Sequence, residues 1–212
     1  MAEIKAVLFD MDGVLIDARD WHYEALNMAL SPFGIEIGRE SHLSTFDGLS
    51  TRQKLGILSR SHAIPEKLHG FLNELKQNYT QELIATRCRP VFQHRYLLSR
   101  LKREGYRLAM CSNSVRLSVD VMAKNAGLSE FLEFTLSNED VKVPKPDPEM
   151  YNMAITRMGL DPCECLIVED NENGILAARA SGAHVMEVAS PDDVTYSRIK
   201  TVLKDIAAEA VA

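Results

Sequence analysis

The sequence has few cysteines, and their spacing is irregular. Four cysteines in 212 residues do not make a disulfide framework. Cys163 and Cys165 are close together, but no second pair of Cys or His residues lies nearby to complete a zinc site. We therefore expect free thiols in a reducing compartment.

Positive charge does not dominate the sequence either. There are 24 Lys and Arg against 30 Asp and Glu, a formal net charge of −6, and no basic cluster is interleaved with aromatic residues. The apolar stretch near the N-terminus is interrupted by Asp10 and Asp12, unlike a signal peptide or a membrane span. These absences predict a cytoplasmic protein that binds neither nucleic acid nor membranes. We further expect a monomer or a weak dimer.

Short apolar runs alternate with helix-like segments along most of the chain. The candidate strands are residues 4–9, 107–111, 134–136, 165–168 and 184–188. The helical candidates between and after them are residues 91–103, 115–125, 148–158, 172–181 and 192–210. Strands that alternate with helices predict an α/β fold, a parallel sheet covered on both faces.

Residues 17–86 break this alternation, because their pattern is helical throughout. The helical candidates are Trp21–Leu30, Thr51–Arg60 and Pro65–Ala85, with turns expected near Pro32-Phe33-Gly34 and Gly48. We therefore predict two domains. Residues 1–16 and 87–212 form the α/β core, and residues 17–86 form a small helical domain inserted after the first strand.

The stretch "VLFDMDGVLID" places two carboxylates at the end of the first apolar run. In an extended chain, residues two apart point to the same side, so Asp10 and Asp12 are expected to lie close together. Like charges repel there, and desolvation costs several kcal/mol per ion. A positive partner is therefore required.

Polar residues also follow the other predicted strands. Ser112 and Asn113 follow the second, Lys145 lies in the loop after the third, and Glu169 and Asp170 follow the fourth. Ligands of open parallel sheets bind at the carboxyl ends of the strands. Four carboxylates against one lysine leave a charge of about −3, which predicts a divalent cation that prefers oxygen ligands, namely Mg²⁺.

This set of groups suits the transfer of a phosphoryl group. The cation and the lysine neutralise phosphate oxygens while an aspartate attacks phosphorus, which gives an aspartyl-phosphate. A second aspartate two residues on can protonate the leaving oxygen and then deprotonate the hydrolytic water.

Four motifs, in this order along nearly the whole chain, strongly resemble those of the haloacid dehalogenase-like superfamily. They are Asp10-Met11-Asp12-Gly13-Val14-Leu15, Ser112-Asn113, Lys145-Pro146-Asp147-Pro148, and Glu169-Asp170 with Asn171-Glu172-Asn173-Gly174. The resemblance implies a Rossmann-like core. It also implies that residues 17–86 are a helical cap, as in the β-phosphoglucomutase and phosphoglycolate-phosphatase branch.

The resemblance implies catalytic roles for four residues, Asp10, Asp12, Ser112 and Lys145, and a substrate-binding role for Asn113. Asp10 would be the nucleophile and a Mg²⁺ ligand. Asp12 would be the general acid and base, with its backbone carbonyl on the metal. Ser112 would bond the phosphoryl oxygens, Asn113 would help to position that group, and Lys145 would offset charge between nucleophile and phosphate.

The resemblance also implies metal ligands and substrate contacts. Asp170 would bind Mg²⁺, with Glu169 binding directly or through water. His22, near the start of the cap, resembles a substrate-gating histidine and is equally compatible with packing. In the loop that faces the active site, mutases carry an arginine for the distal phosphate. Here Thr51 holds that place and Arg52 follows.

The most favoured function is therefore a Mg²⁺-dependent phosphatase, a phosphoric monoester hydrolase. The alternative is a β-phosphoglucomutase-like sugar phosphomutase, which the displaced Arg52 disfavours. A cap that closes over the reaction limits substrates to small phosphorylated metabolites such as sugar phosphates.

Other classes fit less well. A signalling receiver domain compresses its acids, hydroxyl and lysine into about 120 residues, whereas Ser112 lies 102 residues after Asp10. Dehalogenases and phosphonate hydrolases of the family lack an acid at the position of Asp12.

Overall fold

The computed structural model describes residues 3–46, 48–62 and 64–209, and these divide into two compact units. The α/β unit consists of the residues up to Asp17 and those from Arg89 onward. The helical unit spans Ala18–Cys88.

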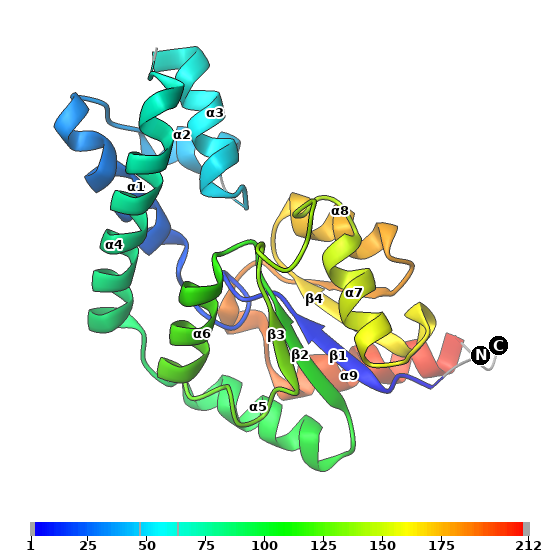
Figure 1. The fold of residues 1–212 in the computed structure, drawn as a ribbon. Coiled ribbons are helices and arrows are strands. Elements are labelled where there is room, and N and C mark those ends of the chain that lie inside the picture. The colour runs from blue at the N-terminus through cyan, green and yellow to red at the C-terminus, as the bar shows by residue number, and fades with distance from the viewer. Residues whose placement is uncertain (1–2, 47, 63, 210–212) are drawn as a thin grey trace. The chain divides into compact units, whose positions relative to one another are not determined.

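A parallel sheet forms the centre of the α/β unit (Figure 1). Its strands are β1 (Ala6–Phe9), β2 (Arg107–Cys111), β3 (Phe134–Leu136), β4 (Cys165–Glu169) and β5 (His184–Glu187). Their order is β3-β2-β1-β4-β5, and every neighbouring pair is parallel. The predicted α/β fold with a parallel sheet is confirmed.

Helices connect the strands and cover both faces of the sheet. They are α5 (Phe92–Arg103), α6 (Arg116–Asn125), α7 (Glu149–Arg157), α8 (Glu172–Ala180) and α9 (Tyr196–Glu209). Right-handed crossovers place α5 and α6 on one face and α7 and α8 on the other. The second face holds a buried cluster in which Leu8 and Ile167 meet Tyr151 and Ala154 of α7 and Ala177 of α8. The last helix begins later than the predicted residue 192, because Pro191–Asp193 form a separate 3₁₀ turn.

β1 lies between β2 and β4, and the sequence accounts for this central position. All four of its side chains are apolar and none is exposed to solvent. A strand that is buried on both faces has no polar alternation, as the sequence showed. The first residue after the strand is therefore the first place where this segment can present a charged side chain.

The helical unit contains α1 (Arg19–Leu30), α2 (Arg39–Ser41), α3 (Thr51–His62) and α4 (His69–Arg87). Leu26, Leu55 and Leu72 contribute to its own buried apolar cluster. The chain leaves the helical conformation at residues 34–38, where the sequence predicts a turn near Pro32-Phe33-Gly34. Gly34 has a positive φ of 68°, and the amide of Asn27 exchanges two hydrogen bonds with the backbone of Ile37, which holds that segment extended.

Two predictions made from absences can be compared with the structure. Cys88, Cys111, Cys163 and Cys165 are free thiols, as expected. Within the described residues, no helix combines the length and apolar character needed to cross a bilayer.

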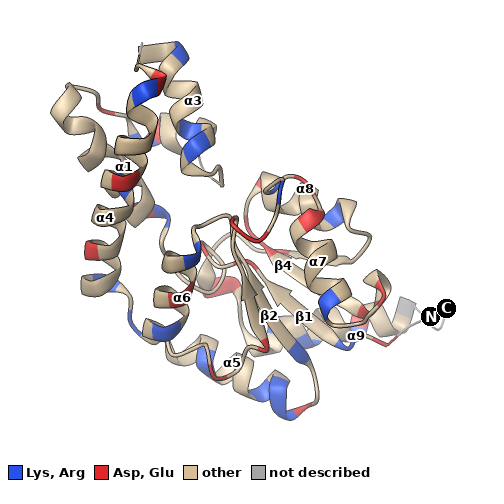
Figure 2. Ribbon diagram, in the orientation of Figure 1, with Lys and Arg blue, Asp and Glu red and all other residues tan. Residues whose placement is uncertain are grey.

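Charged residues of both signs occur along the helices of both units (Figure 2). Several form exposed ion pairs across elements, such as Arg107 with Glu133 and Arg95 with Glu130 in the α/β unit. Exposed pairs of this kind contribute about 0–1 kcal/mol each to stability. The buried charges at the strand ends therefore carry more information about function.

Candidate active site

The strand register brings the polar residues after β1, β2 and β4 to one edge of the sheet. Phe9 pairs with Met110 on one side and with Val168 on the other. Asp10 follows Phe9 directly, and its backbone N–H donates to the carbonyl of Val168 at 3.0 Å. Because all strands are parallel, their carboxyl ends meet at this edge.

A tight turn follows Asp12. Gly13 has a φ of 91°, a left-handed conformation that favours glycine, and its N–H donates to the carbonyl of Ile16 at 2.8 Å. The N–H of Ile16 donates in turn to the carbonyl of Met11 at 2.9 Å. The turn leaves Asp10 buried and Asp12 half-buried at the sheet edge.

Lys145 enters this edge from the loop between β3 and α7. Its side chain is 3% exposed, and its Nζ donates to Asp10 Oδ1 at 2.7 Å and to Glu169 Oε1 at 2.6 Å. It also donates to the backbone carbonyl of Cys111 at 2.9 Å. One buried ammonium therefore joins the ends of β1, β2 and β4.

The electrostatics of this cluster follow from burial and from like charges. Burial and the neighbouring Glu169 carboxylate raise the pKa of Asp10 well above its usual value, although Lys145 opposes the rise. Burial alone would lower the pKa of Lys145. The carboxylates of Asp10 and Glu169 raise it by more than burial lowers it, so the pKa lies above its usual value. The ammonium of Lys145 therefore stays charged. Its single positive charge does not balance the carboxylates of Asp10, Glu169 and Asp170.

A divalent cation fits this donor set. Carboxylate oxygens of Asp10, Glu169 and Asp170 lie within 4.8 Å of one another. Glu169 is fully buried and Asp170 half-buried. Hard cations such as Mg²⁺ bind carboxylate oxygens and offset the repulsion that raises the pKa of Asp10.

Two hydroxyl groups orient the carboxylate of Asp12. Ser112 Oγ donates to Asp12 Oδ2 at 3.2 Å, and Ser114 Oγ donates to the same oxygen at 2.9 Å. The backbone N–H of Ser114 donates to Ser112 Oγ at 3.0 Å, which links the two serines. Sequence reasoning named Ser112 but missed Ser114, since a serine at the start of a loop has no distinguishing pattern.

Asn113 holds the backbone of Lys145. Its Nδ2 donates to the carbonyl of Lys145 at 3.1 Å, and its Oδ1 accepts from the N–H of Lys145 at 3.1 Å. The amide that the sequence assigned to substrate positioning is thus already engaged at both ends. In this structure its visible effect is to fix the lysine loop.

Two further residues bear on the cluster: Tyr151, which was missed in the sequence, and Gly174, which belongs to the fourth motif but was given no role there. Tyr151, on α7, donates from its hydroxyl to Glu169 Oε1 at 2.5 Å and accepts from Lys145 Nζ at 2.8 Å. A Cβ added at Gly174, on α8, would clash with the carboxylate of Glu169, so a side chain there would displace it. Tyr151 belongs to α7, a helix that the sequence treated only as cover for the sheet.

The remaining predicted site residues, His22 and Arg52, lie in the helical unit. His22 is half-buried on α1, and its Nδ1 is 3.2 Å from Nζ of the buried Lys76 on α4. Arg52 is exposed near the start of α3, whereas the preceding Thr51 is half-buried.

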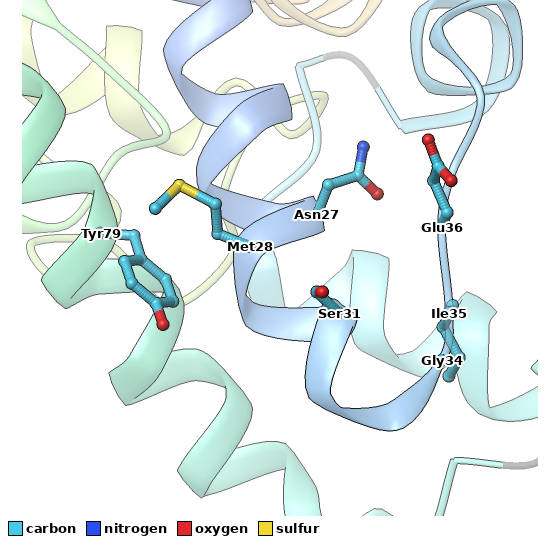
Figure 3. Close-up of a pocket in the computed structure, with 7 residues that line it drawn as sticks. All are labelled: Asn27, Met28, Ser31, Gly34, Ile35, Glu36 and Tyr79. Carbon is cyan, nitrogen blue, oxygen red and sulfur yellow. The ribbon is translucent and has the colours of Figure 1, made fainter.

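The helical unit also contains a hollow of about 590 Å³ between α1, α4 and residues 34–36 (Figure 3). Asn27, Met28, Glu36 and Tyr79 are among the residues that line it. The amide of Asn27 is committed to the backbone of Ile37. The described lining contains neither a lysine nor an arginine to bind an anion, so we assign the hollow no role in phosphoryl transfer.

Comparison with known proteins agrees with this geometry. The family model described as haloacid dehalogenase-like hydrolase matches residues 7–188. Pyrophosphatase PpaX of Bacillus velezensis is 29% identical over 195 residues, which cover 88% of this chain and 83% of that protein. The phosphorylated carbohydrates phosphatase of Thermotoga maritima is 26% identical over 182 residues, which cover 84% of this chain and 82% of that protein.

Among solved structures, a β-phosphoglucomutase from Clostridium difficile superimposes with a TM-score of 0.83. The alignment covers 97% of this chain and 99% of that chain, at 22% sequence identity. At this identity the likeness shows a shared fold.

Proposed function

Because the chain belongs to the haloacid dehalogenase-like hydrolase family, we propose that it is a phosphoric monoester hydrolase acting through an aspartyl-phosphate on Asp10. Its substrate is a small phosphorylated metabolite, for which a sugar phosphate is the leading candidate. The single observation that carries the proposal is the buried contact between Lys145 Nζ and Asp10 Oδ1 at 2.7 Å, beside three further acids. A lysine so placed can neutralise a phosphate while leaving a carboxylate to attack it.

In the first step, a carboxylate oxygen of Asp10 forms a bond to the phosphorus of the substrate. The bond from phosphorus to the leaving alcohol oxygen breaks, and Asp12 gives that oxygen a proton. Ser112 and Ser114 keep the Asp12 carboxylate in one orientation for this transfer.

In the second step, Asp12 takes a proton from water, and the water oxygen attacks phosphorus. The bond from phosphorus to Asp10 breaks, inorganic phosphate leaves, and both carboxyl groups return to their starting state. Lys145 remains beside Asp10 in both steps and offsets the negative charge of the phosphoryl oxygens.

The residues proposed to hold Mg²⁺ are Asp10 and Asp170, with the backbone carbonyl of Asp12 and with Glu169 directly or through water. When bound, the cation neutralises phosphate oxygens and helps to align them with Asp10. Oε1 of Glu169 already accepts from Lys145 and Tyr151, which favours the water-mediated role for this residue.

Hydrolysis is proposed in preference to the mutase reaction. A mutase must turn a bisphosphate intermediate without releasing it, which calls for a second phosphate site such as an arginine clamp. Arg52 is one residue beyond the place where mutases carry that arginine, which is a rotation of about 100° on a helix.

The test is a screen of phosphate release from a panel of phosphorylated metabolites in the presence of Mg²⁺. We expect release of inorganic phosphate from at least one hexose 1-phosphate or 6-phosphate. Formation of the 6-phosphate from a 1-phosphate, faster than phosphate appears, would replace the phosphatase with the mutase. Failure to act on any member of the panel would count against the proposed substrate class.

A further inference from the structure

The ammonium of Lys145 is held by more acceptors than it has hydrogens. An ammonium has three hydrogens, and four acceptor atoms in the described residues lie within 2.9 Å of Nζ. They are Asp10 Oδ1, Glu169 Oε1, the hydroxyl oxygen of Tyr151 and the carbonyl oxygen of Cys111. Only Asp10 belongs to the proposed reacting atoms, so the other three groups decide where the ammonium points.

Tyr151 touches two of the charged groups at once. Its hydroxyl accepts from Lys145 Nζ at 2.8 Å and donates to Glu169 Oε1 at 2.5 Å, while Nζ itself lies 2.6 Å from that same oxygen. The three groups form a closed triangle, and Tyr151 and Glu169 are both 0% exposed. The ring adds a contact of its own, since Nζ is 4.7 Å from its centroid.

Packing alone does not explain the hydroxyl. The ring of Tyr151 belongs to the apolar cluster between the sheet and α7 and α8, where phenylalanine would fill nearly the same volume. A buried hydroxyl is costly unless it has hydrogen-bond partners. Here the hydroxyl exchanges hydrogen bonds with the side chains of Lys145 and Glu169, both of which belong to the site.

We propose that Tyr151 is a positioning residue that sets the Lys145 ammonium against Asp10 through its hydroxyl and through Glu169. It acts only through these side chains and makes no contact with the substrate. The inference rests on the proposed function, in which Lys145 offsets phosphoryl charge. It adds a requirement that the four sequence motifs do not contain.

The test compares Tyr151→Phe with the matched variant Tyr196→Phe. Tyr196 also lies in the α/β unit, and its hydroxyl contacts Glu104 and Arg100, away from the cluster. We expect Tyr151→Phe to lower kcat about 10- to 100-fold, with KM changed less than about 2-fold. Tyr196→Phe should retain kcat within about 2-fold, and both variants should melt cooperatively.

Two results would overturn the inference. One is a kcat for Tyr151→Phe within about 2-fold of the parent protein, because hydrogen bonds to charged groups are worth more than that. The other is loss of the folded state in Tyr151→Phe, which would assign the hydroxyl to stability instead of positioning.

A second readout separates this inference from the proposed function. The ¹H–¹⁵N signal of the Lys145 ammonium, identified by its loss in Lys145→Met, reports the hydrogen bonding of Nζ without turnover. We expect faster hydrogen exchange of this ammonium in Tyr151→Phe and no change in Tyr196→Phe. If the parent protein releases no phosphate, the proposed function fails, and an unchanged Lys145 signal in Tyr151→Phe still rejects the positioning role.

Discussion

Asp10→Asn is expected to abolish phosphate release while leaving the protein folded. The amide keeps the shape of the side chain and an oxygen that can accept from Lys145, but it is not a useful nucleophile. Hydrolysis of a phosphate monoester requires acceleration of up to ~10²¹-fold, so loss of the covalent route should leave no detectable rate. Phosphate release and thermal unfolding of the variant are the measurements.

The pKa of Asp10 gives the sign of the effect on stability. Burial and Glu169 raise this pKa in the folded protein, so folding disfavours the charged carboxylate at neutral pH. A neutral amide removes that penalty, and we expect Asp10→Asn to melt at the same temperature as the parent protein or higher. Asp192→Asn, at an exposed aspartate of the same unit, is the matched control and should keep full activity. One tenth of the parent activity in Asp10→Asn would contradict the covalent mechanism.

Removal of divalent cations with EDTA is expected to silence the enzyme, and Mg²⁺ to restore it. Carboxylate oxygens of Asp10, Glu169 and Asp170 lie within 4.8 Å of one another, and Lys145 donates hydrogen bonds to Asp10 and Glu169. Ca²⁺ should substitute poorly, because it prefers more ligands and looser geometry than Mg²⁺. The measurement is phosphate release in chelated buffer titrated with each cation. Full activity in that buffer would contradict the metal assignment.

The variant Asp170→Ala allows Mg²⁺ binding to be tested without measuring turnover. A cation that binds the folded state raises the melting temperature, and at a given concentration it does so more the tighter it binds. Mg²⁺ should therefore stabilise the parent protein and stabilise Asp170→Ala far less. An equal shift in both would place the cation elsewhere.

Much of the fold could be predicted from the sequence because β1 is so uniformly apolar. Ala6–Phe9 read as a strand buried on both faces, and a parallel sheet then requires the residues after each strand to meet at one edge. The carboxyl ends of parallel strands meet at one edge whatever the order of the strands. Asp10, Lys145 and Glu169 could therefore be expected at the same edge without knowledge of any side-chain contact.

The contacts of Tyr151 and Asn113 could not be predicted from the sequence, because they depend on how a helix or loop is oriented against the sheet. Tyr151 lies among Met150, Ala154 and Ile155 on the buried face of α7, so its pattern is that of a core residue. Only the rotation of α7 against β4 puts its hydroxyl on Glu169. Likewise, nothing in a single sequence shows that Asn113 uses its amide on the backbone of Lys145 instead of on a ligand.

The sequence predicts the turn near Gly34 but not the extended backbone that follows it, for a related reason. Residues 34–38 lack strong apolar periodicity, and the extended backbone there depends on a hydrogen-bonding partner ten residues away, Asn27. The order of residues along the chain gives no sign of that pairing. The roles of His22 and Arg52 in substrate binding remain proposals of the sequence argument.

The most direct test of the proposed mechanism is mass spectrometry of the protein after rapid acid quench during turnover, with the peptide that contains Asp10 analysed. Acid preserves an acyl phosphate long enough for this, and Asp10→Asn provides the blank. The account predicts one added phosphoryl group on Asp10 in the presence of Mg²⁺ and substrate, and none in the blank. Phosphate release with no phosphoryl group on Asp10, or with the group on another residue, would contradict it.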